Sequence, residues 1–458
     1  MKKATFCILV VVVMLCVNFS IIKLEAKAPK IGVNVVLNTD ITDAILADLA
    51  NHGTVRDVVY EIAAVTLQAY KTELPVIRAL PYVQSAAPDA VRTGAPVDTV
   101  EATDFMDGLS PWNLDAINVT DSGFNNRQVG FDGTGVYVAV LDTGLLDSWR
   151  QYFPQERIAV QYAKAFGGGG GDNGNVSEPT NKWEHDQNSH GTHVTSTILG
   201  YSLSGTPVNG VAPMATVIPV KVLNQNGSGW SSVIARGITY IADLKAGPLA
   251  DFPVVINMSL GGSRLDAMEE TAINYAIGQG VIIVASAGNE GTAGMGYPGA
   301  YAPVISVAAS GYIGEWYPPA GSAWWYLMNV DEPTSPAQFY ITDFSSRALA
   351  GQDLDVAAPG SWVVGPYQTN SGQLSYYFLG GTSMACPHVA GIVALMAQKK
   401  SALTASEAEN ILESSAIYLA PGSRSVYNPD GSSSTISWGA NATGAGLATA
   451  DAALSATP

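Results

Sequence analysis

The arrangement of this chain is decided by a stretch that reads VAVLDTG over residues 138–144. Its apolar residues do not alternate with polar ones, which is typical of a parallel strand covered on both faces, and it ends at Asp142. Similar apolar runs cover residues 136–141, 217–223, 254–258, 281–285 and 304–308, and helix patterns cover 193–199, 233–244, 267–277 and 385–398. This alternation predicts an α/β domain with a doubly wound, mostly parallel sheet flanked by helices. Active sites in such domains gather at the carboxyl ends of the strands.

The N-terminus carries the pattern of an export signal. Two lysines precede an apolar run over residues 4–22, and Ala26 follows shortly afterwards, which predicts a signal peptide over residues 1–26. An uncleaved signal anchor is the alternative, because the run approaches the length that spans a membrane. Polar residues inside the run favour cleavage, and either alternative predicts a secreted or extracellular location.

Residues 27–105 form a small α+β domain by prediction, ahead of a main domain over 106–458. We expect strands at 30–37, 58–70 and 82–85, helices at 39–49 and 74–80, and a looser stretch over 88–104. Within the main domain, an insertion at about 311–342 is rich in aromatic residues and prolines. It is predicted to be a surface hairpin or lobe, with an aromatic substrate platform as the alternative.

Composition excludes one class of partner and one source of stability. The chain has 458 residues, a net charge of −17 and a pI near 4.6, which offers no basic stripe for nucleic acid. Two of its three cysteines lie within the predicted signal, so Cys386 would be alone in the mature chain. No intramolecular disulfide can then form, and core packing must stabilise the protein.

Two further stretches bring chemical groups to the edge of the predicted core. NSHGTHV covers residues 188–194 and GGTSMACPHV covers 380–389, each at the start of a predicted helix. Taken alone, each stretch could be an ordinary turn or helix cap. Together with Asp142 they supply an imidazole, His190, and a hydroxyl, Ser383, which is the combination that nucleophilic acyl transfer needs. A glycine-lined helix start also leaves backbone N–H groups free to stabilise an oxyanion.

These stretches, in the order Asp, His, Ser, resemble the signatures of the subtilisin family of serine proteases. The order Asp, His, Ser along the chain is the one known from subtilisin itself. The resemblance extends to NMSLGG at 257–262, ASAGNEG at 285–291, DVAAPG at 355–360 and GAGLATADAAL at 444–454, and covers nearly all of 112–455. It implies that Asp142 orients the imidazole, His190 is the general base, Ser383 is the nucleophile, and the amide of Asn289 binds the oxyanion.

The resemblance also implies how substrate binds and how the enzyme matures. A peptide would add as an extended strand between two segments of the enzyme, which here are Gly227, Ser228, Gly229 and Ser259, Leu260, Gly261. The pocket for the residue before the cleaved bond would be bounded by 287–289 and Gly296, and would favour large apolar side chains. Residues 27–105 would act as chaperone and inhibitor, removed by self-cleavage between Val100 and Ser110. Its partners would be protein and peptide substrates and this propeptide, on a monomeric enzyme.

The chemistry of this family needs no cofactor, although calcium commonly stabilises it. The loop 201–210 and Gln151 depart from the family's main calcium site, so the sequence assigns no metal ligands. Asp172, Asn173, Asn175 and Glu178 could form an oxygen-ligand loop, with a solvated linker as the alternative. A zinc cluster of His185, His190 and His193 lacks the spacing of the common zinc proteases.

Two other functions remain as alternatives. One is a catalytically silent relative that serves as a binding or inhibitory protein. Against it counts that all four chemical positions are filled by the residues that catalysis needs. The other is a membrane-anchored processing protease of narrow specificity, which the apolar run at 4–22 permits.

Overall fold

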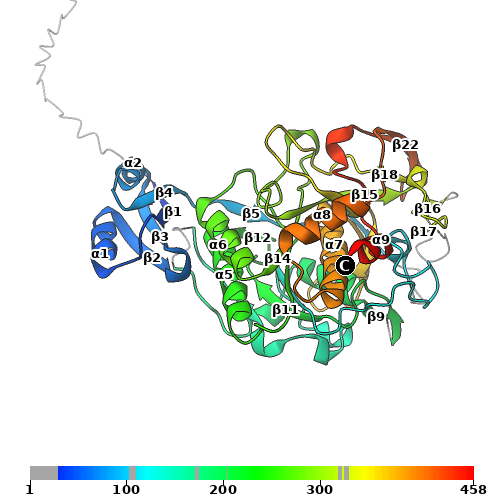
Figure 1. Cartoon of the computed structure of the whole chain (residues 1–458), viewed down its shortest axis with the longest axis horizontal. Coiled ribbons are helices and arrows are strands. Elements are labelled where there is room, and N and C mark those ends of the chain that lie inside the picture. The colour runs from blue at the N-terminus through cyan, green and yellow to red at the C-terminus, as the bar shows by residue number, and fades with distance from the viewer. Residues whose placement is uncertain (1–28, 103–109, 171–174, 204, 318–321, 324–329) are drawn as a thin grey trace, which may run out of the picture.

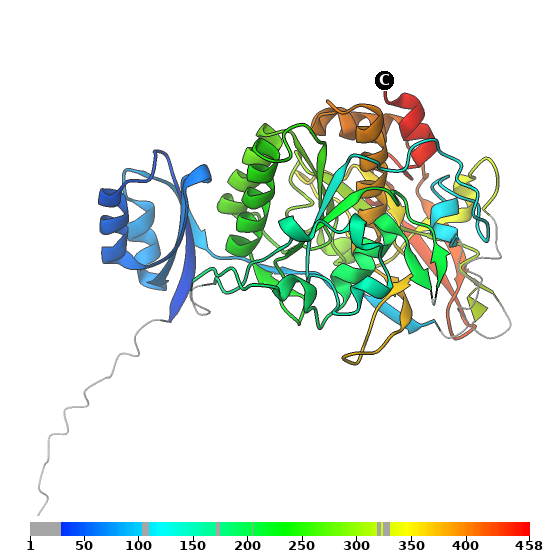
Figure 2. The ribbon, with the colours of Figure 1, turned by 90° about the horizontal axis from the view of Figure 1, so that it is seen from below.

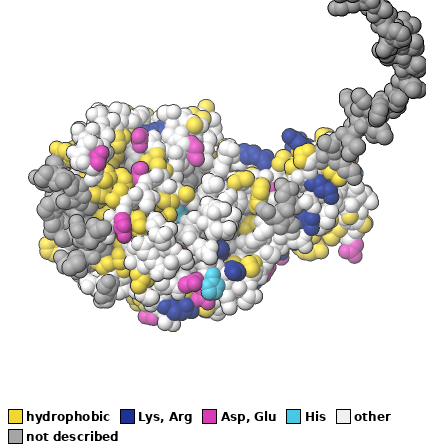
Figure 3. Space-filling view, turned by 180° about the vertical axis from the view of Figure 1, so that it is seen from behind, with side chains coloured by type: hydrophobic (Ala, Val, Ile, Leu, Met, Phe, Trp, Pro, Cys, Tyr) yellow, Lys and Arg dark blue, Asp and Glu magenta, His cyan; other side chains and the backbone are white. Residues whose placement is uncertain are grey.

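The computed structural model describes residues 29–102, 110–170, 175–203, 205–317, 322–323 and 330–458. They form a small N-terminal unit and a larger α/β body (Figure 1). Seen from behind, the N-terminal unit projects from the body as a separate lobe (Figure 3). Within the described residues, none of the helices combines the length and apolarity that crossing a bilayer requires. The run at 4–22, predicted to be a signal or anchor, lies outside those residues.

The N-terminal unit is a four-stranded antiparallel sheet with two helices on one face. Its strand order is β2-β3-β1-β4, and the strands are β1 (Lys30–Leu37), β2 (Gly53–Val59), β3 (Ala64–Tyr70) and β4 (Val83–Pro88). The helices α1 (Asp43–His52) and α2 (Leu74–Arg78) lie on the side away from the body (Figure 2). Thr42 caps the N-terminus of α1, because its side chain accepts a hydrogen bond from the N–H of Ile45.

Two predictions for this part of the chain are wrong. The strand expected over 58–70 is two antiparallel strands, because the chain turns back at Ala63, whose φ is 46°. The loose stretch expected over 88–104 contains β5 (Val91–Thr93) and β6 (Asp98–Glu101). Neither strand belongs to the N-terminal sheet, and both pair with strands of the body.

The body is built on the parallel sheet that the apolar runs predict. Its strand order is β18-β15-β14-β13-β7-β11-β8, with β19 beside β15, and the ladders β11·β7·β13·β14·β15 are parallel. The five predicted runs correspond to β7 (Tyr137–Asp142), β11 (Thr216–Lys221), β13 (Val254–Met258), β14 (Val281–Ser286) and β15 (Ile305–Tyr312). The edges are β8 (Lys164–Ala165), β18 (Phe339–Ile341), which is antiparallel, and β19 (Val356–Pro359).

Helices cover both faces of this sheet, as expected for a doubly wound domain. Along β7, Ala139 and Leu141 pack in the core under α5 (Ser231–Ala246) and α6 (Ala267–Gly278). Val138 and Val140 pack in the core under α4 (His190–Leu199) and α7 (Thr382–Lys399). The short α3 (Trp112–Asp115), α8 (Ala405–Ser415) and α9 (Ala450–Ala456) complete the α-helices among the described residues.

The aromatic insertion is a hairpin in its described part. Strand β16 (Trp316–Tyr317) pairs with β17 (Ser322–Ala323). Trp316 is buried and packs edge-on against Trp362 and Phe378, with ring centroids 5.3 Å apart in both pairs. It is therefore part of the core and offers no substrate platform, while residues 324–326 lie outside the described part. The remaining strands are β9 (Tyr201–Leu203), β10 (Thr206–Val208), β12 (Ser228–Trp230), β20 (Val363–Pro366), β21 (Tyr376–Gly380), β22 (Gly422–Tyr427) and β23 (Ser433–Trp438).

Candidate active site

The three chemical residues converge at one edge of the sheet. Asp142 is the last residue of β7, His190 is the first residue of α4, and Ser383 is the second residue of α7. His190 Nδ1 lies 2.9 Å from both carboxylate oxygens of Asp142. The side chains of this pair are fully buried, and Ser383 is 3% exposed. The paired carboxylate fixes the proton on Nδ1 and leaves Nε2 as a proton acceptor.

Close backbone packing holds the His190–Asp142 pair in place. Asp142 also accepts a hydrogen bond from the N–H of Thr143 at 2.6 Å, and the hydroxyl of Thr143 accepts one from Gly191 N–H at 2.9 Å. A Cβ at Gly191 would lie 2.4 Å from the carbonyl oxygen of Gly144. Only glycine therefore lets the start of α4 approach the end of β7 this closely.

No hydrogen bond joins Ser383 to His190 in this structure. Its Oγ donates to the carbonyl oxygen of Ser259 at 3.2 Å, and His190 Nε2 is buried without a partner. Catalytic hydrogen bonds of this kind often form only when substrate is bound.

The side chain of Asn289 is oriented by the residue before the serine. Its Oδ1 accepts hydrogen bonds from the N–H of Thr382 at 2.9 Å and from the hydroxyl of Thr382 at 2.8 Å. Because both of these donors bind the oxygen of the Asn289 amide, its Nδ2 is the end that stays free to donate. The amide group is half-buried, so it can donate to a negative charge that develops beside Ser383.

The two predicted substrate segments are occupied by the chain's own residues 91–94. Strand β5 pairs antiparallel with β12, with Thr93 opposite Ser228. Thr93 also exchanges two backbone hydrogen bonds of 2.9 Å with Gly261. Gly94 N–H donates to the carbonyl oxygen of Gly227 at 2.9 Å. An extended segment thus lies between the two strands that the resemblance assigns to substrate.

The same segment continues past Ser383 on the other side. Val97 N–H donates to the carbonyl oxygen of Gly380 at 2.7 Å, and β6 then pairs antiparallel with β21. Between these anchors, a Cβ at Gly94 would lie 3.4 Å from His190 Cε1. The Cα of Pro96 lies 3.7 Å from the Cβ position of Gly381. The stretch from Gly94 to Pro96 therefore crosses the edge of the sheet where the three chemical residues meet.

Comparison with known proteins decides the family. The model of the subtilase family matches residues 133–445, more than half of the chain. This chain belongs to the subtilase family. It is 35% identical over 317 residues to the thermostable alkaline protease of Halalkalibacterium halodurans, a match that covers 69% of this chain and 70% of that protein. It is 32% identical over 291 residues to thermitase of Thermoactinomyces vulgaris, covering 61% and 85%. The subtilase is therefore a serine endopeptidase with a subtilisin-like fold.

Solved structures agree with this fold. The subtilase matches sphericase with a TM-score of 0.52 at 28% identity, covering 74% of this chain and 97% of that one. It matches fervidolysin from Fervidobacterium pennivorans with a TM-score of 0.65, covering 94% of this chain but only 62% of that longer one. At 23% identity the fervidolysin match shows the fold alone.

The predicted pocket beside the nucleophile has glycine walls. Gly296 N–H donates to the carbonyl oxygen of Ala287 at 2.8 Å, which joins the two predicted sides. A Cβ at Gly261 would lie 3.8 Å from the Cα of Gly296, so the substrate segment and this wall face each other closely. Glu290, near the rim, is exposed and accepts a hydrogen bond from the hydroxyl of Ser346 at 3.0 Å.

The other histidines and the cysteine near the triad are structural. Burial lowers the pKa of His193 to about 3 and that of His388 to about 4, so both are neutral. His193 Nε2 donates to the carbonyl oxygen of Val363 at 3.0 Å, and His388 Nε2 pairs with the side chain of Asn113 at 2.7 Å. Cys386 is fully buried, and burial raises the pKa of its thiol. None of these groups is poised for catalysis.

In the described part of the predicted oxygen-ligand loop, the ligand candidates are paired with basic side chains instead. Asn175 accepts a hydrogen bond from Arg56 at 3.3 Å, and Glu178 pairs with Lys164 at 2.6 Å. Residues 172 and 173 lie outside the described part. Among the described residues, two groups of three carboxylates could hold a metal ion, and neither includes a histidine. They are Asp115, Asp121, Glu332 and Asp353, Asp355, Glu409.

Sequence reasoning missed two residues at this site, Arg92 and Glu269. Both are fully buried and they form an ion pair, although 177 residues separate them in the chain. A charged residue in a loose stretch or in the first turn of a helix is ordinarily a solvated one. The burial of Arg92 and Glu269 is therefore visible only in the fold.

Proposed function

We propose that this subtilase is an exported endopeptidase in which Asp142, His190 and Ser383 form the catalytic triad. The observation that carries the proposal is the buried His190–Asp142 pair beside Ser383, in a cleft that an extended peptide already fills. Ser383 Oγ attacks the carbonyl carbon of the bound peptide while His190 Nε2 takes the hydroxyl proton. Asp142 stabilises the imidazolium that forms. The oxyanion accepts hydrogen bonds from Asn289 Nδ2 and from the backbone N–H of Ser383.

The second half of the reaction reverses these roles. The imidazolium gives its proton to the departing amine, the peptide C–N bond breaks, and an acyl ester remains on Ser383. A water molecule then attacks the ester while His190 takes its proton. Collapse of that intermediate releases the new carboxyl group and returns the proton to Ser383 Oγ, so the enzyme needs no cofactor for the chemistry.

Substrates are recognised mainly through their backbone. A peptide in the place of residues 91–94 makes strand hydrogen bonds with Gly227, β12 and Gly261, which do not depend on sequence. We expect broad specificity with a preference for a large apolar residue before the cleaved bond, since glycines leave room between 287–289 and Gly296.

The N-terminal unit acts as a propeptide that inhibits the enzyme, under the same proposal. Its sheet lies against α6, and its last residues occupy both sides of the cleft. In this register, the peptide bond that lies between the two paired parts of the segment, at Ser383, is Ala95–Pro96. Proline has no N–H and a fixed φ, and it restricts the residue before it, so this bond is a poor substrate. The segment therefore fills the cleft and resists hydrolysis.

Maturation between Val100 and Ser110 then requires a second molecule. Any bond in this range lies at least four residues beyond Pro96, on the stretch that β6 begins. A precursor whose cleft holds residues 91–97 cannot bring such a bond to its own Ser383. We propose that traces of active enzyme cut the precursor between Val100 and Ser110 and so release the inhibitor.

The test is incubation of the full precursor and its Ser383→Ala variant, followed by intact mass and a casein-type assay. We expect the wild type to shorten after a lag that decreases with protein concentration, and then to digest casein. The variant alone should stay whole and inert, and added wild-type enzyme should shorten it. Equal behaviour of the two proteins would overturn the triad and favour a binding or inhibitory protein. Recovery of activity only in membranes would favour the anchored processing protease.

A further inference from the structure

The segment that fills the cleft holds a buried arginine. Arg92 is 0% exposed, whereas Val91 and Thr93 on either side of it are exposed. The alternation along β5 turns this one side chain into the body. A guanidinium is almost never fully buried unless it is paired.

The partner of Arg92 belongs to the body. Glu269 lies in the first turn of α6, and its carboxylate is also 0% exposed. Arg92 Nε lies 3.2 and 3.0 Å from its two oxygens, and Nη2 donates to one of them as well. Nη2 also donates to the carbonyl oxygen of Arg264 at 3.1 Å. This fork-like geometry is specific for a guanidinium.

Further acidic groups surround the guanidinium. Burial alone would lower the pKa of Arg92, but Glu269, Asp266 and Asp89 together raise it above its ordinary value. Asp266, the N-cap of α6, belongs to the body like Glu269. When the N-terminal unit leaves, Asp89 leaves with it, but the two body carboxylates remain. Glu269 then lies at the end of a pocket without its cation, and an unpaired buried charge is costly.

We propose that this pocket selects substrates with arginine at the position that Arg92 occupies, with Glu269 as the specificity-determining residue. If Ala95 stands at the residue before the cleaved bond, Arg92 is the fourth residue before that bond. The inference rests on the proposed function, because it assumes that substrates follow the path of residues 91–97. A hydrogen-bonded charge pair contributes about 1.5–3 kcal/mol, which corresponds to a preference for arginine over leucine of about 10–150-fold.

The test compares two chromogenic peptides that differ only at this position, Arg-Thr-Gly-Phe and Leu-Thr-Gly-Phe, each with a nitroanilide leaving group. We expect the mature enzyme to show a kcat/KM ratio that favours arginine by at least about tenfold. Glu269→Gln and Glu269→Leu should reduce the ratio to near or below one. Glu270→Gln, a change at the next residue of the same helix, should leave it unchanged.

The outcomes separate the two proposals. Cleavage of both peptides at equal rates, or an arginine preference that Glu269→Gln retains, would overturn the arginine pocket and leave the protease intact. No cleavage of either peptide or of casein would overturn the proposed function itself. Circular dichroism spectra that match those of the parent show that the Glu269 variants fold.

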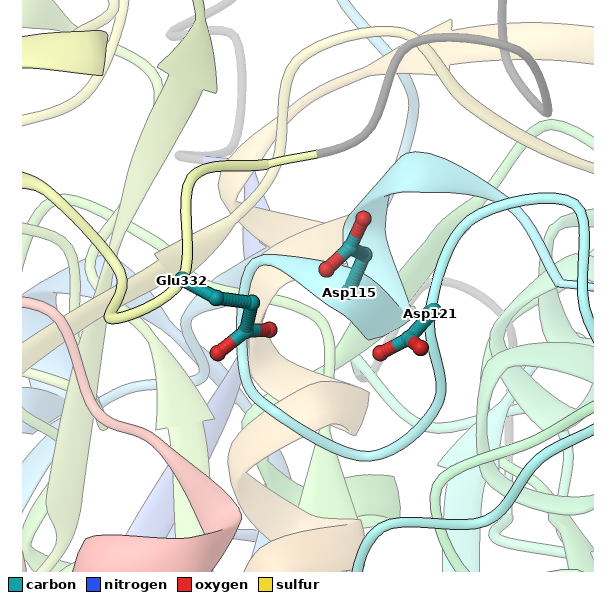
Figure 4. A group of neighbouring side chains, drawn as sticks. All are labelled: Asp115, Asp121 and Glu332. Carbon is teal, nitrogen blue, oxygen red and sulfur yellow. The ribbon is translucent and has the colours of Figure 1, made fainter.

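A second inference rests on a separate group of side chains. Asp115 at the end of α3, Asp121 in the loop after it, and Glu332 in the insertion turn their carboxylates toward one another (Figure 4). One oxygen from each lies within 4.8 Å of the other two. The three residues come from separate parts of the sequence, since Glu332 lies 217 positions after Asp115.

One of these carboxylates has a buried oxygen without a partner. Asp115 is 1% exposed, and its Oδ2 accepts hydrogen bonds from Ser122 N–H at 3.1 Å and Val330 N–H at 2.9 Å. Its Oδ1 is buried and accepts none. A buried, unsatisfied carboxylate oxygen calls for a cation or a proton.

In the described part of the chain, no basic side chain is paired with the group. None of the ion pairs found among the described residues includes any of the three carboxylates. In the sequence, residues 103–109, 318–321 and 324–329 include no lysine or arginine. Asp121 does accept hydrogen bonds, from Asn126 at 2.6 Å and Gln128 at 2.9 Å, which orient its carboxylate.

The geometry points to a calcium site formed by Asp115, Asp121 and Glu332. All three ligands would be carboxylate oxygens. Such a set suits calcium better than zinc, because zinc sites are usually built from nitrogen and sulfur ligands. Calcium binds oxygens at about 2.3–2.6 Å in irregular geometry, so two ligands can lie up to about 5 Å apart. An ion here would join α3, near the predicted mature N-terminus, to the insertion.

The site is tested in the full-length Ser383→Ala chain, which lacks the proposed nucleophile and so does not digest itself. We expect Glu332→Gln to unfold at the same or a higher temperature than its parent in EDTA, because it removes repulsion. In millimolar calcium the parent should gain several degrees and the variant much less. Terbium emission excited through Trp112, three residues from Asp115, should fall in the variant. Glu409→Gln, in the other carboxylate group, is the matched control.

Two results would overturn the calcium site. One is an equal rise of the unfolding temperature with calcium in the parent and in Glu332→Gln. The other is loss of the calcium effect in Glu409→Gln alone, which would place the ion at the second group. Because Glu332 is exposed, its substitution should not prevent folding.

Discussion

The stability of this subtilase should fall in alkaline solution because of one buried carboxyl, that of Glu315. The group accepts hydrogen bonds from Tyr312 N–H at 2.8 Å and from the hydroxyls of Tyr340 and Ser361 at 2.9 Å each. Burial outweighs these donors and raises its pKa from 4.5 to about 8. The folded state therefore holds this proton across a pH range in which the unfolded chain has lost it.

The sign and size of the effect follow from linkage. Where the folded state binds more protons than the unfolded state, the free energy of unfolding decreases as pH rises. Each pKa unit is worth about 1.4 kcal/mol, so between pH 5 and pH 9 ionisation of Glu315 costs the folded state on the order of 4 kcal/mol. Glu315→Gln keeps an uncharged acceptor and should lose this dependence.

The assay is urea unfolding of the full-length chain in the Ser383→Ala background, at pH 5 and at pH 9. We expect the free energy of unfolding of Glu315→Gln, relative to its parent, to become more favourable by about 4 kcal/mol from the lower to the higher pH. Glu156→Gln, at an exposed glutamate, should show no such change. A constant difference between Glu315→Gln and its parent at the two pH values would refute the reasoning.

Three further predictions concern the active site. Asn289→Leu should reduce kcat by about 10²–10³-fold with little change in KM, which is the loss known for such a donor in subtilisin itself; an unchanged kcat would exclude the amide from the oxyanion site. Gly191→Ala should lower kcat/KM and destabilise the fold by about 1–3 kcal/mol, because its Cβ would lie 2.4 Å from the Gly144 carbonyl oxygen; thermal unfolding and peptide kinetics measure both effects. Cys386 should not react with a thiol reagent or a mercurial in the native mature enzyme, because its thiol is buried and burial raises the pKa of that thiol. It should react once urea unfolds the enzyme. Rapid modification of Cys386 in the native enzyme would contradict this prediction.

The sequence predicts the body of this protein well because its signals there are local. Five unbroken apolar runs correspond to five parallel strands, since each strand is buried under helices on both faces. The strand expected over 58–70 is wrong because Ala63 turns the chain without a glycine or asparagine to mark the place. The stretch over 88–104 lacks a signal for another reason. Its strands exist only because β12 and β21 of the body pair with them.

The candidate site divides in the same way. The motifs that carry Asp142, His190, Ser383 and Asn289 are contiguous in the sequence, so the resemblance identifies them one by one. The ion pair between Arg92 and Glu269 joins two charged residues from distant segments of the chain. Such residues are ordinarily exposed to solvent, and only the fold shows that both are buried. The carboxylates of Asp115 and Glu332 meet for the same kind of reason.

Under the proposed function, the cleft-filling segment combines strong binding with slow hydrolysis, and the two properties come from different residues. Backbone pairing on both sides of Ser383 and the Arg92–Glu269 pair hold it in the manner of a substrate. Pro96 sits where an ordinary substrate would present the amine that leaves. Binding energy that holds the ground state without helping the transition state gives inhibition instead of turnover. A substrate that keeps arginine at the position of Arg92 and replaces the proline should therefore convert the same contacts from inhibition to catalysis.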